Sequence, residues 1–110
     1  MIDEATFRRE SERALERLKQ ALIAAEDASS SFEFEDNNGA MNVLFEDGSS
    51  KFVVTPNTPV RQIWVSANSK SYKLDWDFVE NAFVHLESGD TLRTLMEKAL
   101  AKRLGEEVNL

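Results

Sequence analysis

Residues 32–45 read FEFEDNNGAMNVLF, and within this stretch the sequence changes from a helical to a β pattern. From Phe32 to Glu35, apolar and acidic side chains alternate strictly, as in a strand with one buried and one solvated face. Residues 36–39 favour a turn because Asn and Gly tolerate positive φ, and residues 41–45 form the next apolar run. The stretch therefore predicts two antiparallel strands joined by a turn.

Upstream of this change, residues 3–26 have the pattern of one amphipathic helix. Asp3 is placed as its N-cap, and Ile2 and Phe7 have the spacing of a hydrophobic staple. Residues 28–31 end the helix. Its apolar face, at a period of 3.6 residues, consists of Phe7, Ala14, Leu15, Leu18, Ala21, Leu22 and Ala25, and the opposite side carries Arg9, Arg13 and Arg17.

Downstream, the sequence predicts strands at residues 51–55, 61–66 and 72–76, and a short one at 82–85. Asp47-Gly48 is a hairpin signal between the second and third strands. Residues 56–59 contain two prolines, so we expect them to interrupt the pairing.

A second helix is expected to open at residues 88–90 and to stop at Gly105, with Lys102 and Arg103 in its last turn. Its apolar stripe consists of Leu92, Leu95, Met96, Ala99, Leu100 and Leu104. The order helix, antiparallel meander of five or six strands, helix predicts an α+β fold, a two-layer α/β sandwich, in one domain over residues 1–110. Two helices on one face would leave the other face of the sheet open to solvent or to a partner.

The formal net charge of −7 lies in one part of the sequence. Residues 20–50 contain seven acids and no Lys or Arg, whereas the other 13 acids and 13 bases cancel. Nucleic acids and membrane surfaces are anionic, so this balance argues against both as partners. The sequence has neither an apolar run of about 18 residues nor a basic, apolar leader. We therefore expect a cytoplasmic protein.

Residues for covalent catalysis are scarce. The chain has no cysteine, which excludes disulfides, thiol catalysis and cysteine-ligated metal sites, and its single histidine is His85. No Gly-x-Ser-x-Gly elbow is present, and the four glycines are too dispersed for a phosphate loop. A carboxylate pair remains open, but nothing singles one out. We expect no catalytic residues.

The acids between residues 20 and 50 allow two interpretations. One is a solvated face. The other is a cation-binding surface, because Glu26 and Asp27 lie at a helix C-terminus, where each negative charge is unfavourable by about 0.3–1 kcal/mol. A bound cation or a basic partner would relieve this. Oxygen ligands suit hard cations such as iron(III), Ca²⁺ or Mn²⁺ and would form weak, exposed sites.

The segment Arg61-Gln62-Ile63-Trp64-Val65-Ser66 is a second candidate site. Strand alternation places Ile63 and Val65 on one face, with Gln62 and Trp64 on the other. A Trp on a polar face suits a binding hot spot. Equally, Trp64 could simply pack under a long neighbour such as Lys73.

Several segments together resemble the frataxin family in its bacterial, CyaY-type form. They are Thr58-Pro59 with the Arg61–Ser66 segment, Tyr72-Lys73-Leu74-Asp75-Trp76, Asp47-Gly48, Ser88-Gly89-Asp90-Thr91-Leu92, Leu95-Met96-Glu97 and Gly105-Glu106-Glu107-Val108-Asn109. The resemblance covers nearly the whole chain. It departs from the family pattern at residues 19–25, where the first helix of family members is densely acidic, and at Phe83, where a second Trp is common.

The resemblance implies a frataxin fold and a monomeric, non-catalytic iron–sulfur cluster assembly protein. It implies weak iron binding at an acidic ridge, which here would comprise Glu26, Asp27, Glu33, Glu35 and Asp36. It also implies contact with a cysteine desulfurase and an iron–sulfur scaffold protein through Asn57, Gln62, Trp64 and Lys73. The alternative from another class is a small acidic chaperone or adaptor with an α–β–α architecture like that of type III secretion chaperones.

Overall fold

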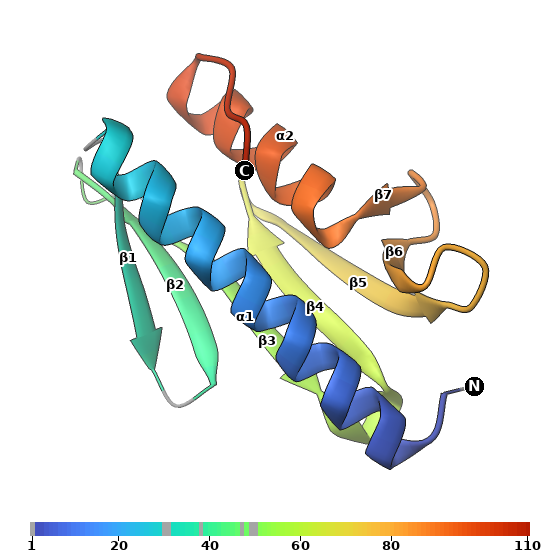
Figure 1. Ribbon diagram of the computed structural model, residues 1–110. Coiled ribbons are helices and arrows are strands. Elements are labelled where there is room, and N and C mark those ends of the chain that lie inside the picture. Colours follow the sequence, from blue (N-terminus) through green and yellow to red (C-terminus); the bar gives the residue numbers. More distant parts are fainter. Residues whose placement is uncertain (1, 30–31, 38, 47, 49–50) are drawn as a thin grey trace.

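The computed structural model describes residues 2–29, 32–37, 39–46, 48 and 51–110, and within these residues two helices lie on one face of an antiparallel sheet (Figure 1). The helices are α1 (Glu4–Ser29) and α2 (Leu92–Leu104). The strands, whose order in the sheet is their order along the chain, are β1 (Phe32–Asn37), β2 (Ala40–Phe45), β3 (Phe52–Asn57), β4 (Gln62–Ala67), β5 (Lys70–Asp77), β6 (Ala82–His85) and β7 (Asp90–Thr91). The predicted two-layer α+β sandwich is confirmed.

Helix α1 begins at the predicted cap. Asp3 Oδ1 accepts the backbone N–H of Thr6 at 2.8 Å, and Oδ2 accepts the Thr6 hydroxyl at 3.1 Å. Ile2 and Phe7 are both buried, as a hydrophobic staple requires. The helix continues three residues beyond the predicted end at residue 26. In the described part of the chain, neither helix is long and apolar enough to cross a membrane.

The number of strands differs from the predicted five or six, since the described residues form seven. The additional strand, β7, pairs Asp90 with His85 and Thr91 with Val84. Two residues are too few to show a period, so the sequence assigned this segment to the opening of the second helix. That helix instead begins at Leu92, and its N-cap is Thr91, whose hydroxyl oxygen accepts the N–H of Thr94.

The expected interruption at residues 56–59 is only partly correct. Strand β3 continues through Pro56 and Asn57, which pair with Ile63 and Gln62. The pairing of β2 with β3 ends at Met41 and Val54, so Pro56 has a neighbouring strand on one side only, a position that tolerates proline. The chain leaves the sheet after Asn57, in the 3₁₀ turn η1 (Thr58–Val60).

The turn predicted at residues 36–39 is tighter than expected, because β1 extends to Asn37 and β2 starts at Ala40. Asn38 lies outside the described residues. So does Asp47 of the predicted Asp-Gly hairpin, whose Gly48 has a φ of +71° and donates its N–H to the Phe45 carbonyl.

The core lies between the helices and the sheet. The predicted apolar residues of α1 and α2 are buried or half-buried there, together with Ile63, Val65 and Leu74 of the sheet. The Phe7 and Phe83 rings meet edge to face, with centroids 5.7 Å apart. Ser11, which the apolar pattern omits, is also buried, and its hydroxyl donates to the Arg8 carbonyl.

We expect Phe7→Ala to lower the free energy of unfolding by about 3–5 kcal/mol, because it removes a fully buried ring that packs on Phe83. Urea unfolding followed by circular dichroism measures this loss. Phe78→Ala is the matched control, since the Phe78 side chain is 67% exposed and its loss should change stability by no more than about 0.5 kcal/mol. Similar losses in the two variants would contradict this account of the core.

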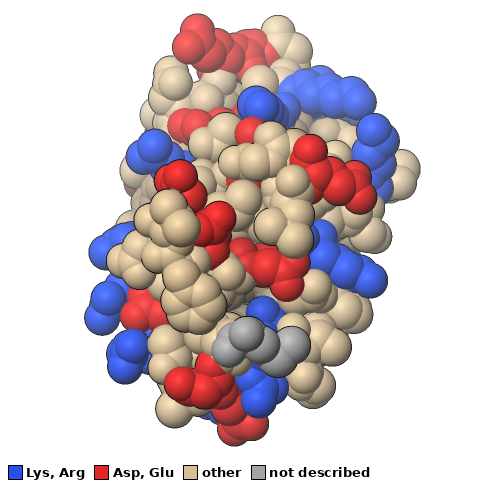
Figure 2. Space-filling view, turned by 90° about the vertical axis from the view of Figure 1, so that its right-hand side faces the viewer, with Lys and Arg blue, Asp and Glu red and all other residues tan. Residues whose placement is uncertain are grey.

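Acidic and basic side chains are interspersed over the side of the molecule shown in Figure 2. One ion pair joins β7 to α2: Lys98 Nζ donates to Asp90 Oδ1 at 2.9 Å. This bond, helped by the Ser88 hydroxyl, lowers the pKa of Asp90 against the opposing effect of burial. Because the folded-state pKa is lowered, Asp90 stabilises the fold above its unfolded-state pKa, and this contribution disappears as the pH falls through the folded-state pKa.

We therefore expect Lys98→Met to raise the pKa of Asp90 towards its ordinary value and to reduce stability at neutral pH but not at pH 2. NMR titration of the Asp90 carboxyl carbon measures the pKa, and unfolding curves at the two pH values measure the stability. Lys102→Met removes the same charge from the same helix without touching Asp90. An unchanged Asp90 titration in Lys98→Met, or an equal shift in the control, would refute the assignment.

Candidate functional site

The face of the sheet opposite the helices carries the four residues predicted to bind a partner. Asn57 pairs with Gln62, and Trp64 pairs with Lys73, so these side chains are cross-strand neighbours on β3, β4 and β5. Strand β4 alternates as predicted, with Ile63 and Val65 buried beneath the helices and Trp64 37% exposed on the open face. The structure therefore brings together the four residues that the resemblance implied, with Asn57 at the end of β3 and not in the loop where we expected it.

Trp64 is held in one orientation by its neighbours. Its indole Nε1 donates to Gln62 Oε1 at 2.9 Å, and Lys73 Nζ lies 5.1 Å from the ring centroid, within the range of a cation–π contact. Lys73 therefore lies over the ring, as one interpretation of the sequence proposed, and the ring remains accessible. That Trp64 binds a partner stays a prediction. A large aromatic surface in a fixed orientation can bind a partner with little loss of side-chain entropy.

Asp75 belongs to this group, although the sequence analysis did not select it. Its Oδ1 accepts Gln62 Nε2 at 3.1 Å, which fixes the amide whose oxygen holds the indole. The alternation of β5 already places Asp75 on the same face as Lys73. That Asp75 lies beside Gln62, however, follows only from the register that pairs these two residues. We refer to Asn57, Gln62, Trp64, Lys73 and Asp75 as the tryptophan face.

A left-handed residue directs the chain into β4. Arg61 has a φ of +55° at the end of η1, and its guanidinium donates to the Thr58 carbonyl. Arg61 Nη2 also lies 3.8 Å from Glu4 Oε1, at the start of α1. These contacts hold Gln62, the first residue of β4, in a fixed position relative to α1.

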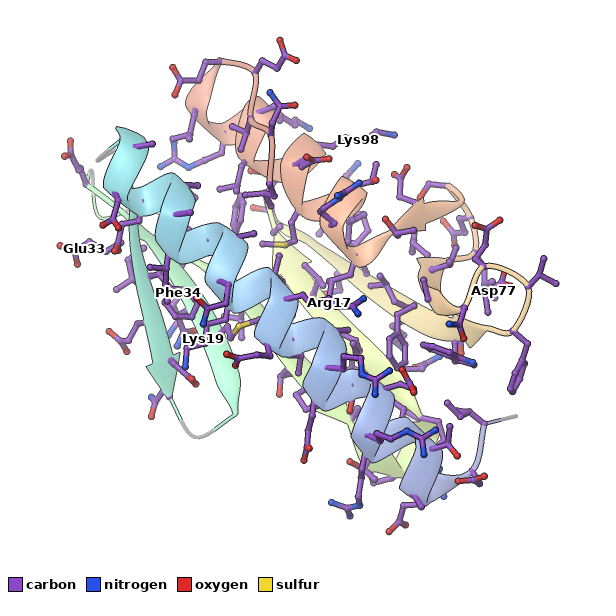
Figure 3. The ribbon with its side chains drawn as sticks, viewed as in Figure 1. Arg17, Lys19, Glu33, Phe34, Asp77 and Lys98 are labelled. Carbon is purple, nitrogen blue, oxygen red and sulfur yellow. The ribbon has the colours of Figure 1, made fainter. Side chains whose placement is uncertain are left out.

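The acids predicted to bind iron are divided between the two layers. Figure 3 shows Phe34 turned towards α1 and Glu33 pointing away from it. Glu35 pairs with Asn42, Asn42 pairs with Val53, and Val53 pairs with Ser66, which lies on the same face of β4 as Trp64. Glu35 and Glu33, two residues apart on β1, therefore share the open face with Trp64. Asp36 has the opposite parity and lies 3.3 Å from Lys19 Nζ of α1.

Two of the five acids already have partners. Glu26 Oε2 accepts the backbone N–H of Phe34 at 2.5 Å, on the free edge of the sheet, and Asp36 has the ion pair with Lys19. Asp27, Glu33 and Glu35 are exposed and have no ion pair or hydrogen bond among the described residues. The described residues contain no group of three or more His, Cys, Asp or Glu side chains arranged to hold a metal ion. The iron ligands therefore stay a prediction.

Comparison with known proteins gives consistent results. A family model of the frataxin-like domain matches residues 1–106. The "iron-sulfur cluster assembly protein CyaY" of Azotobacter vinelandii is 30% identical over 83 residues, which cover 76% of this chain and 74% of that protein. The protein of the same name from Pseudomonas aeruginosa is 30% identical over 90 residues, or 82% of each chain.

Among solved structures, a frataxin from Psychromonas ingrahamii covers 98% of this chain with a TM-score of 0.75 and 18% sequence identity, so the likeness concerns the fold. None of these matches supports the secretion-chaperone alternative. Since the family model spans nearly all of the sequence, the chain belongs to the frataxin family and is of its bacterial, CyaY type.

Proposed function

We propose that this chain acts in iron–sulfur cluster assembly, the role that its relatives' names give for those proteins, and that the tryptophan face is its binding surface for a protein partner. The observation that carries this proposal is Trp64, 37% exposed in a fixed orientation on a sheet face that neither helix covers. Trp and other aromatic anchors dominate the binding energy of protein interfaces. The partner in this proposal is a cysteine desulfurase together with its scaffold protein.

Charge supports a basic partner beside the tryptophan face. Glu33 and Glu35 lie on the same face as Trp64 and form no ion pair among the described residues. Lys73, by contrast, is occupied with the Trp64 ring. A surface with free carboxylates at one edge and an aromatic anchor at its centre attracts a basic surface and sets its orientation.

The proposed role is non-covalent. The chain has no cysteine, so a sulfur atom that moves as a persulfide must be carried by thiols of the partners. The only histidine, His85, has its Nδ1 2.8 Å from the Ser88 hydroxyl in the turn after β6. We propose that the chain modulates the desulfurase and scaffold complex through binding and charge.

We further propose that iron binds weakly at the acidic end of the molecule, formed by Glu26, Asp27, Glu33, Glu35 and Asp36. The acids with free carboxylates are Asp27, Glu33 and Glu35, whereas iron would have to compete with a backbone N–H at Glu26 and with Lys19 at Asp36. Exposed oxygen ligands split between two layers form a site of low affinity.

Trp64→Ala should weaken binding to the cognate cysteine desulfurase and scaffold complex by at least about tenfold, because a hot-spot side chain contributes about 2 kcal/mol or more. Calorimetry or biolayer interferometry measures the dissociation constant. Phe78→Ala removes an exposed aromatic ring from the turn after β5 and should leave binding unchanged. Equal affinities for Trp64→Ala and the wild-type chain would overturn the assigned surface, and no binding by the wild-type chain would overturn the role.

Iron(II), added anaerobically, should broaden the NMR signals of residues 26–36 before those of any other segment. Glu33→Gln combined with Glu35→Gln should raise the iron concentration needed for this broadening several-fold, because it removes two of the three free carboxylates. The matched control is Glu106→Gln with Glu107→Gln, which removes the same charge from the exposed C-terminal segment. Broadening that begins elsewhere, or an equal effect of the two double variants, would show the iron ligands to be wrong.

A further inference from the structure

A cavity of about 300 Å³ opens in the helix layer, between α1, strands β5 and β6, and the start of α2. It is of the size at which small-molecule sites begin, about 300–1,000 Å³. It lies on the opposite side of the sheet from Trp64, because Trp76 and Phe83, which line it, have the parity of the buried strand residues. Neither the proposed partner surface nor the proposed iron ligands contribute to it.

The floor of this cavity is aromatic and rigid. The rings of Trp76 and Phe83 pack edge to face, with centroids 5.1 Å apart and planes at 70°. Phe83 and Leu18 are buried, whereas Trp76 is only half-buried. Within the described part of the chain, the Trp76 indole N–H has no hydrogen-bond acceptor. The floor therefore offers an apolar aromatic surface and, among the described residues, one indole N–H without an acceptor.

The rim of the cavity is basic. Arg13 and Arg17 reach it from α1, and Arg93 from the first turn of α2. The one acid on the lining, Glu10, is bonded to Arg9 at 3.2 Å and lies 3.6 Å from Arg13. Arg17 and Arg93 form no ion pair or hydrogen bond among the described residues, and Figure 3 shows Arg17 leaving α1 on the side that faces α2.

Two unpaired guanidinium groups above an aromatic floor favour a ligand that has both an anionic group and a ring. Guanidinium groups form paired hydrogen bonds with phosphate and carboxylate oxygens. Acids are interspersed with bases on the face shown in Figure 2, which does not suit a long polyanion, since that needs an extended basic surface. The cavity lining carries three arginines and one acid, in a chain whose net charge is −7.

We propose that this cavity binds a small molecule whose aromatic ring packs on Trp76 while its phosphate or carboxylate group bonds to Arg17 and Arg93. This inference goes beyond the proposed function and does not depend on it. Because the cavity and the tryptophan face lie in different layers, the ligand and the protein partner can be bound at the same time.

The binding test uses the Trp64→Phe variant, in which Trp76 is the only remaining tryptophan and its fluorescence reports on the cavity. Adenosine monophosphate is the phosphate-bearing probe, and 4-hydroxybenzoate is the carboxylate-bearing probe. We expect saturable quenching at submillimolar concentration with at least one of them. Adenosine alone and inorganic phosphate alone should each bind at least about tenfold more weakly, since each lacks one of the two contacts.

Arg17→Gln and Arg93→Gln test the basic rim. Each should weaken binding of the charged probe by about tenfold or more, the loss expected for one charge-assisted hydrogen bond. Arg8→Gln removes the same charge from α1 outside the cavity, where Arg8 pairs with Glu4, and should leave binding unchanged. Circular dichroism confirms that each variant folds. The proposal is overturned if neither probe binds at millimolar concentration, if adenosine binds as tightly as its monophosphate, or if Arg8→Gln and Arg17→Gln have equal effects.

Discussion

Burial of one face of the sheet beneath α1 and α2 is the constraint on which the rest of this structure depends. Strand residues alternate between the two faces, so the strands commit Ile63, Val65 and Leu74 to the core and thereby place Gln62, Trp64 and Lys73 on the other side. A slip of one residue in the register of β4 would bury Gln62 and Trp64 and expose the core residues. The exposure of Trp64 is therefore fixed by the cost of exposing its neighbours, which explains how a large aromatic side chain is retained on the open face.

The same alternation places Asp36 on the opposite face of β1 from Glu33 and Glu35, and Glu26 reaches this strand from α1. Glu26 accepts an N–H from the free edge of β1, and an occupied edge is a poor template for pairing with another chain. Asp36 pairs with Lys19 and so joins the edge strand to α1. These two acids contribute to the fold, whereas Glu33 and Glu35 have no ion pair or hydrogen bond among the described residues. Lys19 thus has a structural role at a position where family resemblance predicts an acid.

The sequence predicts those features that depend on a repeated period. It placed both helices, the α1 cap at Asp3, the longer strands and the outward position of Trp64. It does not predict β7, because two residues are too few to show a period. It ends β3 too early, because a strand can contain Pro56 only where no neighbouring strand needs its N–H, and this depends on where the pairing with β2 ends. Asp75 is missed because its hydrogen bond to Gln62 depends on the register of β4 and β5.

The two cavity arginines also differ from the sequence prediction. The sequence assigns Arg13 and Arg17 to the side opposite the apolar face, yet both line the cavity beside Leu18. Long arginine side chains at the border of an apolar face can turn towards a hollow, which only the packing of β6 and α2 against α1 creates.

The two faces of the sheet border surfaces of different kinds. The open face joins an aromatic anchor to carboxylates that have no ion pair among the described residues, as suits a large partner surface. The helix layer contains a cavity too small for a protein segment of any length but large enough for one ring and its anionic group. Strand β5 contributes to both, since Lys73 and Asp75 face the partner side and Trp76 forms the cavity floor. Because β5 pairs with β4 from Lys70 to Asp75 and with β6 from Leu74 to Asp77, neither surface can shift by moving this strand without breaking the sheet. The two surfaces therefore share a rigid support.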